Sequence, residues 1–236
     1  RINLRDLPDR EHVRYSSKSV KRRQRAFGYT EEDLKIFIAP MAKIGQEPIG
    51  AMGTDTPIAA ISERPKLLFD YFTQQFAQVT NPPLDAIREE VVTSMTTSIG
   101  PVRNLLEANA EHAKQMVLDY PIIGNDELAK IKHIDRANNI GKAVTISCLY
   151  RVDDGPEALE ARLESICAEV DQALLVGATF IVLSDRDSNR ELAPIPSLLS
   201  CSAVHHHLIR NGTRMTAEPG IAAGHATHVH LVVTHI

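Results

Sequence analysis

Two apolar runs and the stretch between them decide the fold class of this chain. The runs are Ala143-Val-Thr-Ile-Ser-Cys-Leu-Tyr150 and Thr179-Phe-Ile-Val-Leu-Ser184. Both are rich in β-branched residues, which favours short buried strands. Residues 156–176 between them, and residues 196–211 after them, carry apolar side chains at helical spacing. A strand, a crossover helix and a second strand pair in parallel, so the sequence predicts an α/β fold with a mostly parallel sheet and alternating helices.

Outward from these runs, the 236 residues are predicted to form one domain in three parts. Residues 111–236 are the alternating strand–helix part. Its further predicted elements are strands at 115–118 and 228–234 and a helix at 125–137. Residues 29–110 are a helical part with a glycine- and proline-rich loop, and residues 1–28 are a lead-in segment with a short helix.

Caps and breakers place the elements of the helical part. Thr30, followed by acidic residues in the first turn, predicts a helix over 31–44. Ser62 begins the next helix, whose apolar residues recur at three- and four-residue spacing as far as Val79. The paired prolines after it can open a short helix through Arg88. The β-branched run at 91–99 then predicts a strand.

Composition and charge exclude several classes of partner. The net charge is −4, and the basic residues concentrate only at 18–25, so the sequence predicts neither a nucleic-acid nor a membrane partner. No apolar run approaches the length needed to cross a bilayer. The three cysteines, Cys148, Cys167 and Cys201, are widely spaced, which fits reduced thiols in a cytosol-like compartment rather than a disulfide framework.

The histidines raise the hypothesis of a metal site. They gather in the C-terminal third, as His205, His206, His207, His225, His228, His230 and His235. Zinc needs three or four ligands on a fixed scaffold, and two histidines with one residue between them on a strand face the same way. Three consecutive helical histidines, however, point in three directions, and the sequence has no His-Glu-x-x-His or Cys-x-x-Cys pattern. Core, cap and interface histidines are the favoured interpretation.

The stretch Asp185-Arg-Asp187 is a second candidate site. It follows the predicted strand at 179–184, where α/β sheets place their chemistry. Two acids around an arginine are also typical of a charge-paired structural loop, which is the favoured interpretation. The glycines of the loop, Gly45, Gly50 and Gly53, match neither the dinucleotide nor the P-loop spacing. No Gly-x-Ser-x-Gly nucleophile motif is present.

A set of motifs resembles a known family. The stretches are Ile49-Gly-Ala-Met-Gly-Thr-Asp-Thr-Pro57, Leu67-Leu-Phe-Asp-Tyr-Phe-Thr-Gln-Gln-Phe76 and Gln78-Val-Thr-Asn-Pro-Pro83. Together they resemble the central, connecting domain of the glutamate synthase large subunit, without gaps over about 46–100. Weaker similarity continues through Leu183-Ser-Asp-Arg186 and Ile195-Pro-Ser-Leu-Leu199, and it is loosest over 216–236.

The resemblance implies a connector within a larger enzyme of glutamate biosynthesis. In that family a glutamine amidotransferase domain precedes the central domain, and an FMN-binding barrel with an iron–sulfur cluster follows it. The central domain is an α/β domain that resembles a rudimentary FMN-binding TIM barrel, with no catalytic, cofactor or metal residues expected in this stretch. The implied partners are the two flanking domains, and the implied location is the cytoplasm, or the plastid stroma in a photosynthetic eukaryote.

The same resemblance points to Thr80 and Asn81 as residues of an ammonia tunnel. Ammonia from glutamine crosses such a tunnel to the flavin site, and small neutral polar groups can line it without trapping a cation. The alternative is that Asn81 merely caps the helix opened by Pro82. Two rival functions stay open: an autonomous metal-dependent enzyme using the histidines, and an interaction module using the basic face at 18–25.

Overall fold

The computed structural model describes residues 1–45, 61, 63, 71, 83–100, 106, 110–120, 123–136, 141–214 and 218–219. Two compact units divide the chain. The first, which we call the α/β unit, comprises Arg1–Arg14 and Thr93–His235. The second, which we call the inserted unit, comprises Tyr15–Val92. The chain therefore begins in the α/β unit, leaves it and returns.

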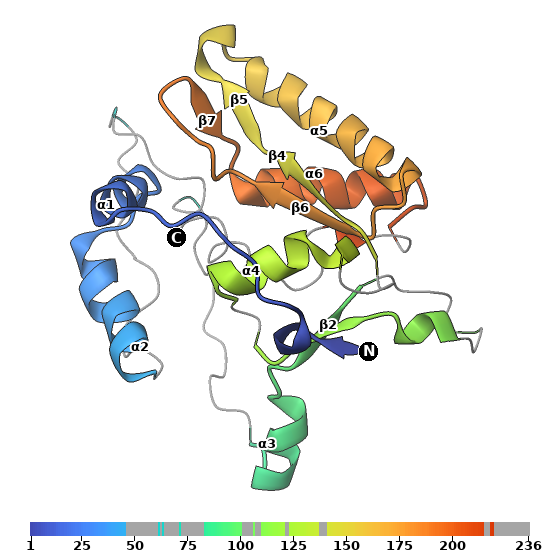
Figure 1. Ribbon diagram of the computed structural model, residues 1–236. Helices are drawn as coiled ribbons and strands as arrows, with labels where there is room; N and C mark the ends of the chain where they lie inside the picture. Colours follow the sequence, from blue (N-terminus) through green and yellow to red (C-terminus); the bar gives the residue numbers. More distant parts are fainter. Residues whose placement is uncertain are drawn as a thin grey trace. The chain divides into compact units, whose positions relative to one another are not determined.

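The predicted strand–helix alternation is present in the α/β unit (Figure 1). Strands β4 (Ala143–Ser147) and β8 (Glu218–Pro219) pair in parallel with β6 (Phe180–Ser184), on its two sides. Helices α5 (Ala158–Leu175) and α6 (Ser197–Arg210) follow β4 and β6 as crossovers. The bounds of β6, α5 and α6 agree with the predicted ranges to within two residues, so this part of the prediction is confirmed.

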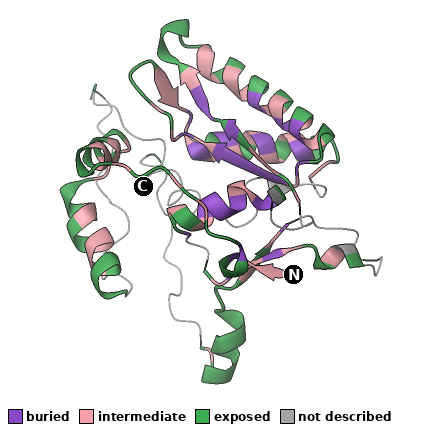
Figure 2. Ribbon diagram, in the orientation of Figure 1, coloured by how far each residue is buried: buried purple, intermediate pink, exposed green. Residues whose placement is uncertain are grey.

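Strand β6 is the centre of the core. Phe180 and Val182 belong to one cluster of buried side chains, and Ile181 and Leu183 belong to another. Successive side chains of a strand point to opposite faces, so β6 is covered on both, as its buried ribbon in Figure 2 shows. The second cluster also contains side chains of α5 and α6, which places both crossover helices on one face of the sheet.

Helix α4 (Asn125–Lys132) contributes to the other cluster, through Leu128 and Ile131. It starts where the Gly124 N–H donates to Glu127 Oε2 at 2.7 Å. The predicted helix over 125–137 is interrupted at His133, whose Nδ1 lies 2.8 Å from the Ala129 carbonyl oxygen of the last turn. A 3-10 turn, η5 (Ile134–Arg136), follows.

A small mixed sheet completes the α/β unit. Strand β3 (Met116–Leu118) was predicted, and it pairs in parallel with β1 (Ile2–Asn3) and antiparallel with β2 (Thr97–Ile99). The predicted strand over 91–99 is therefore wrong in its first half, because helix α3 (Ala86–Val92) runs into it. Asp85 Oδ1 accepts from the N–H groups of the first turn of α3 at 2.9 and 3.1 Å, and this capping overrides the β propensity of the valines.

The predicted strand over 143–150 is two strands. Strand β4 ends at Ser147, and β5 (Leu149–Arg151) pairs antiparallel with β7 (Leu192–Pro194), which was not predicted. The fold is thus mixed α/β, with parallel pairing around β6 and between β1 and β3, and antiparallel pairing between β2 and β3 and between β5 and β7. Within the described residues the sheets are open and do not close into a barrel. The remaining 3-10 turns are η1 (Leu4–Asp6), η4 (Ala110–Ala113) and η6 (Val152–Asp154).

The described part of the inserted unit is helical. Helix α1 (Ser17–Ala26) carries the predicted basic run, is capped by Ser16, and has no buried residue. The predicted helix over 31–44 is also present, with the Asp33 N–H donating to Thr30 Oγ1 at 3.1 Å. It begins as a π-helical segment, η2 (Asp33–Ile38), and ends as α2 (Ala39–Ile44). The second residue of α2 is a proline, which cannot donate to the preceding turn and so disturbs its hydrogen-bond register.

The first glycine of the predicted glycine- and proline-rich loop lies within the described residues. Gly45 ends α2 with a φ of +63°, the left-handed geometry typical of a glycine at this position, so the predicted loop begins here. The other glycines of that loop, Gly50 and Gly53, and the predicted helix begun by Ser62 lie outside the described residues. No helix in the described ranges has the length and apolar character required to cross a membrane.

Candidate functional site

The carboxyl ends of β4 and β6 form the edge at which an α/β sheet would carry a site. The candidate stretch from Asp185 to Asp187 lies there, directly after β6. Its backbone forms a tight turn, in which the Ser188 N–H donates to the Asp185 carbonyl oxygen at 3.1 Å. The Asp185 side chain is 3% exposed, so it points into the molecule and not toward a solvent-accessible ligand.

Cys148 is the residue at which the chain changes partner strands. Its N–H donates to the Ser184 carbonyl oxygen of β6 at 2.8 Å, while its own carbonyl oxygen accepts from the Ile195 N–H at 2.9 Å. The bend between β4 and β5 is therefore bonded on one side to the parallel sheet and on the other to Ile195, the residue directly after β7. Burial raises the pKa of the Cys148 thiol to about 12, and the charge of Asp185 adds to this effect. A thiol that stays protonated is not a nucleophile at neutral pH.

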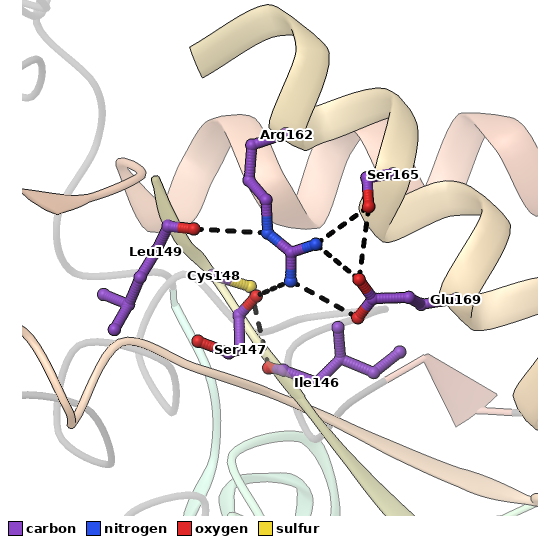
Figure 3. A network of polar contacts seen from close by, with 7 residues as sticks. All are labelled: Ile146, Ser147, Cys148, Leu149, Arg162, Ser165 and Glu169. Carbon is purple, nitrogen blue, oxygen red and sulfur yellow. Dashed lines mark hydrogen bonds and ion pairs between the residues drawn. The ribbon is translucent and has the colours of Figure 1, made fainter. Parts of the chain in front are cut away.

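Arg162 of α5 binds the same bend from outside the sheet (Figure 3). Its Nε donates to the Leu149 carbonyl oxygen at 3.2 Å, and its Nη2 donates to the Ser147 carbonyl oxygen at 2.6 Å. The guanidinium also pairs with Glu169 through both Nη atoms and donates to Ser165 Oγ. These five acceptors match the five N–H donors of an arginine.

The Arg162 contacts stabilise the bend between β4 and β5. Where β4 ends and β5 begins, the carbonyl groups of Ser147 and Leu149 point toward α5, and Arg162 supplies them with donors. Glu169, two turns along α5 and itself bonded by Ser165, holds the guanidinium in the plane that reaches both carbonyls. The arginine is fully engaged in shaping the bend and has no donor left for a ligand.

The charges around the Asp185–Asp187 turn come from two elements. Burial together with the charge of Arg186 lowers the pKa of Lys132, the last residue of α4, while the charge of Asp187 acts in the opposite direction. These neighbouring charges of both signs agree with the favoured interpretation of this stretch as a charge-paired loop. The described side chains at this edge bind one another and the backbone of the β4–β5 bend, so we interpret them as structural.

The described histidines of α6 do not converge. His207 Nε2 lies 2.9 Å from the Asp171 carboxylate and ties α6 to α5. His205 Nδ1 accepts from Arg214 Nε at 3.2 Å, and burial and this neighbouring cation lower its pKa. His206 is exposed, and its ring lies at 82° to the His205 ring with the centroids 5.3 Å apart. Three directions for three neighbouring histidines are as the helical period predicts.

The metal hypothesis gains no support from the part of the chain that the structure describes. Among those residues, no three histidine, cysteine or acidic side chains are grouped in a way that could hold an ion. His225, His228, His230 and His235 lie outside the described residues. Thr80 and Asn81, the predicted tunnel residues, also lie outside them, so their roles stay predictions.

Comparison with known proteins identifies the family. A family model described as the glutamate synthase central domain matches residues 22–236. This chain belongs to the glutamate synthase central domain family. The match covers both the motif-rich region around the paired prolines and the α/β unit from β2 onward, so it confirms the resemblance over nearly the whole chain.

Relatives of this central domain occur in enzymes with different electron donors in their names. It is 42% identical over 209 residues to glutamate synthase [NADH] of Schizosaccharomyces pombe, covering 89% of this chain and 10% of that protein. It is 39% identical over 225 residues to the glutamate synthase [NADPH] large chain of Bacillus subtilis, covering 95% and 14%. A third relative, ferredoxin-dependent glutamate synthase 2 of Synechocystis sp., is 42% identical over 205 residues, covering 85% and 13%.

The chain therefore spans 10% to 14% of the length of these relatives.

The sequence analysis did not identify Arg162, the residue that binds the backbone of the β4–β5 bend. Its signal was weak: a lone arginine inside an amphipathic helix, with Ser165 and Glu169 at helical spacing after it. Only knowledge of the bend at Cys148 shows that two backbone carbonyls need a donor at that point.

Proposed function

We propose that this chain is the connecting domain of a glutamate synthase, joining a glutamine amidotransferase domain to an FMN-binding synthase domain. The match of residues 22–236 to the central domain family carries this proposal. The small share of each relative that the chain covers supports a part within a larger polypeptide. The reaction of the whole enzyme is the formation of glutamate from glutamine and 2-oxoglutarate, and the flanking domains are the partners. The compartment is the cytoplasm, or the plastid stroma, as in relatives whose names are chloroplastic.

The connecting domain also contributes to an ammonia tunnel, with Thr80 and Asn81 at its wall. Ammonia released into water at neutral pH becomes mostly protonated and loses its nucleophilicity, so a passage that excludes water keeps it reactive. The Thr80 hydroxyl and Asn81 amide are neutral, and the prolines that follow them restrict the backbone. The division into a lead-in segment (1–28), a helical part (29–110) and an alternating part (111–236) is part of the same proposal.

The FMN and the iron–sulfur cluster of the whole enzyme belong to the neighbouring domain in this proposal, because the described residues do not fit them. Cluster ligands are grouped cysteine thiolates, whereas among the described residues Cys148, Cys167 and Cys201 do not belong to any group of ligand side chains that could hold a metal. A flavin phosphate needs donors at the carboxyl edge of the sheet, where Asp185 presents a buried carboxyl group. We assign neither group to this chain.

We further propose that the α/β unit is a rudimentary relative of the flavin barrel. Support comes from β4, β6 and β8, which are consecutive parallel strands whose crossover helices, α5 and α6, share one face. The other face, which would be the interior of a barrel, is packed in one cluster with α4. An experimental structure of the whole enzyme tests this idea, because the three strands should superpose on three neighbouring strands of its barrel.

The tunnel is tested by enlarging its proposed wall in the full-length synthase. Thr80→Trp and Asn81→Leu should lower glutamine-dependent glutamate formation roughly ten- to a hundredfold, because ammonia transfer is obstructed. Glutamine hydrolysis and glutamate formation from added ammonia should fall much less. Rates of all three reactions are measured for each variant, with Thr80→Ser as the control that keeps the hydroxyl group. Equal loss of all three rates would remove the tunnel assignment.

A further inference from the structure

Helix α1 carries a row of positive charges that the proposed function does not use. Its exposed cations are Lys18, Lys21, Arg22 and Arg25, and we call these four residues the basic stripe. Each of the last three follows the first by three, four or seven residues, so all four share one face of the helix. Within the described ranges, no side chain of the basic stripe takes part in an ion pair or a hydrogen bond.

The other face of α1 makes the local contacts of the helix. The Arg23 guanidinium lies 4.2 Å from the centre of the Tyr15 ring. At the start of the helix, the Ser19 N–H donates to Ser16 Oγ at 3.3 Å. Arg23 and Ser19 are half-buried, whereas the basic stripe is exposed. The contacts that hold α1 therefore leave the basic stripe accessible.

A stripe of like charges is unfavourable in a helix that has no partner. Two pairs of these cations are four residues apart, and like charges at that spacing destabilise a helix. Helix α1 contains no acidic residue, its two apolar residues are Val20 and Ala26, and none of its residues is buried (Figure 2). A helix that is polar on all sides and lacks internal ion pairs is typical of a bridge between domains. A surface of opposite charge would relieve the repulsion.

The composition of α1 favours an acidic protein surface over other polyanions. A helix that lies on a membrane needs an apolar face beside its basic one, and α1 does not have such a face. Binding of single-stranded nucleic acid combines cations with aromatic side chains on which bases stack. Helix α1 has no aromatic residue, and the ring of Tyr15 before it already contacts Arg23.

Exposed ion pairs are suited to orienting domains that are already tethered. Each such pair contributes little affinity, but a set of them fixes the register in which two surfaces meet. A tether supplies the affinity, because it makes the association intramolecular. The chain spans 10% to 14% of the length of its relatives, so most of the surface that could cover α1 belongs to other parts of such a polypeptide.

We propose that the basic stripe docks on an acidic surface of the glutamine amidotransferase domain and fixes the orientation of that domain against α1. This inference rests on the proposed function, in which the amidotransferase domain precedes this chain. Residues 1–16 then separate that domain from α1, a reach of at most about 55 Å. So short a tether keeps the acidic surface at high local concentration.

The first test is carbodiimide cross-linking of the full-length synthase, which joins a lysine amine to a carboxylate in contact with it. Lys18 and Lys21 should be recovered by mass spectrometry linked to acidic residues of the amidotransferase domain. These links should be lost in 1 M NaCl, where charges are screened beyond about 3 Å. Lys35, which lies 3.4 Å from Glu31, is the internal control for the reaction.

Three cross-linking results contradict the proposal. The first is recovery of the Lys35 link without any link from the basic stripe to the amidotransferase domain. The second is a link from the stripe to an exposed acid of this chain, such as Glu160 or Glu164 of α5. The third is a link to a second, isotope-labelled copy of the enzyme.

The second test separates docking from helix stability with one substitution. Within α1, Lys21→Glu places an acid four residues before Arg25, and this pair should slow amide exchange of the helix up to about twofold. Against an acidic surface the same change adds repulsion. In the full-length synthase, the α1 amides of Lys21→Glu should therefore exchange at least about fivefold faster than those of the parent enzyme. Lys43→Glu, which reverses the charge of an exposed lysine of α2, is the matched control and should not alter α1.

Unaltered or slower exchange of α1 in Lys21→Glu would overturn the docking. Salt-sensitive binding of an oligonucleotide that Lys21→Glu abolishes would also overturn it, because the stripe would then belong to a nucleic-acid site. The proposed function fails through a different result: a full-length protein that has no amidotransferase domain, or that forms no glutamate from glutamine and 2-oxoglutarate. With that domain and activity present, a negative result in the two tests removes the docking alone.

Discussion

At the scale of single residues, Arg162 is the side chain on which the β4–β5 bend relies. Replacing it with methionine removes five hydrogen bonds and leaves the Ser147 and Leu149 carbonyl groups without their donors. We expect Arg162→Met to lower the free energy of unfolding by about 2–4 kcal/mol, and Arg162→Lys by about 1–2 kcal/mol, because lysine keeps the charge but cannot span both carbonyls. Urea unfolding of the 236-residue chain, followed by circular dichroism, measures both.

The matched control is Arg151→Lys. Arg151 lies in β5, near the bend, and its pair with Asp154 is exposed and 3.9 Å long. Exposed pairs of this kind contribute little, so the change should stay within about 0.5 kcal/mol. If Arg162→Lys were as mild as Arg151→Lys, the bidentate geometry would not matter, and Arg162 would be an ordinary surface cation.

Cys148 makes stability depend on alkaline pH. Its folded pKa is about 12, whereas an ordinary thiol in the unfolded chain has a pKa of 9.0. Between these values the unfolded chain binds fewer protons, so this contribution is complete below pH 9 and is lost as pH rises, by up to about 1.4 kcal/mol per pH unit. Urea unfolding at pH 8, 9.5 and 10.5 should show a shallower decline for Cys148→Ala than for the parent chain.

The thiol of Cys167 provides the comparison for this pH dependence. Burial also raises its pKa, but it lies on a helix with intermediate exposure. Cys167→Ala should therefore remove a smaller part of the alkaline decline than Cys148→Ala. An identical decline in the parent chain and in Cys148→Ala would show that the thiol ionises in the folded state as easily as in the unfolded one.

At the scale of elements, the start of the parallel pair β4–β6 depends on the absence of a side chain at Gly141. A Cβ there would lie 1.8 Å from Thr179 Oγ1 and 3.2 Å from the Phe180 ring. Thr179 Oγ1 accepts from the Lys142 N–H at 3.0 Å, so it cannot move away without losing this bond. Gly141→Ala should lower the free energy of unfolding by about 1–3 kcal/mol, as overpacking does, in urea denaturation.

A double-mutant cycle identifies the cause of this loss. Thr179→Ala removes the crowded hydroxyl, so the double variant should be more stable than the sum of the single changes predicts. Gly155→Ala is a contrasting control: its Cβ would meet nothing within 4 Å, and only its φ of +87° makes the substitution unfavourable. Simple additivity of Gly141→Ala and Thr179→Ala would show that their side chains do not collide.

At the scale of the whole molecule, the two units should differ in protection from hydrogen exchange. Strand β6 is buried on both faces, whereas the described helices of the inserted unit, α1, α2 and α3, have no buried residue. Amides of β4, β6 and α5 should exchange only through large openings, and those of α1 and α2 should exchange at least about a hundredfold faster. Mass spectrometry of the 236-residue chain measures this difference.

The same measurement in the full-length synthase extends the comparison. If the inserted unit is held between neighbouring domains, the amides of α1 and α2 should become protected there while those of β6 change little. Equal protection of both units in the 236-residue chain would contradict the prediction, because it would mean that α1 and α2 are as stably packed as the core strands.

Local sequence patterns predicted the central strand and its two helices, but they did not predict which strands pair with one another. The strand at 179–184 and the helices at 156–176 and 196–211 were recognised from apolar period alone. The run at 143–150 is apolar throughout, so nothing in it marks the change of partner at Cys148. Strands as short as β1 and β7 carry too few residues for a period, and the valines of α3 followed the Asp85 cap rather than their β propensity.

Local periodicity specified the alternation of strands and helices, and contiguous motifs such as Gln78-Val-Thr-Asn-Pro-Pro83 specified the family. Packing, in contrast, was needed to show that residues 1–14 belong to the α/β unit, that Arg162 binds the backbone of the β4–β5 bend, and that Lys130 binds the Arg5 carbonyl oxygen. A buried carbonyl group or a desolvated charge needs a hydrogen-bonding partner, and folding determines which side chain is close enough to provide it. Such a pairing does not produce a periodic sequence pattern, so it cannot be read from the sequence alone.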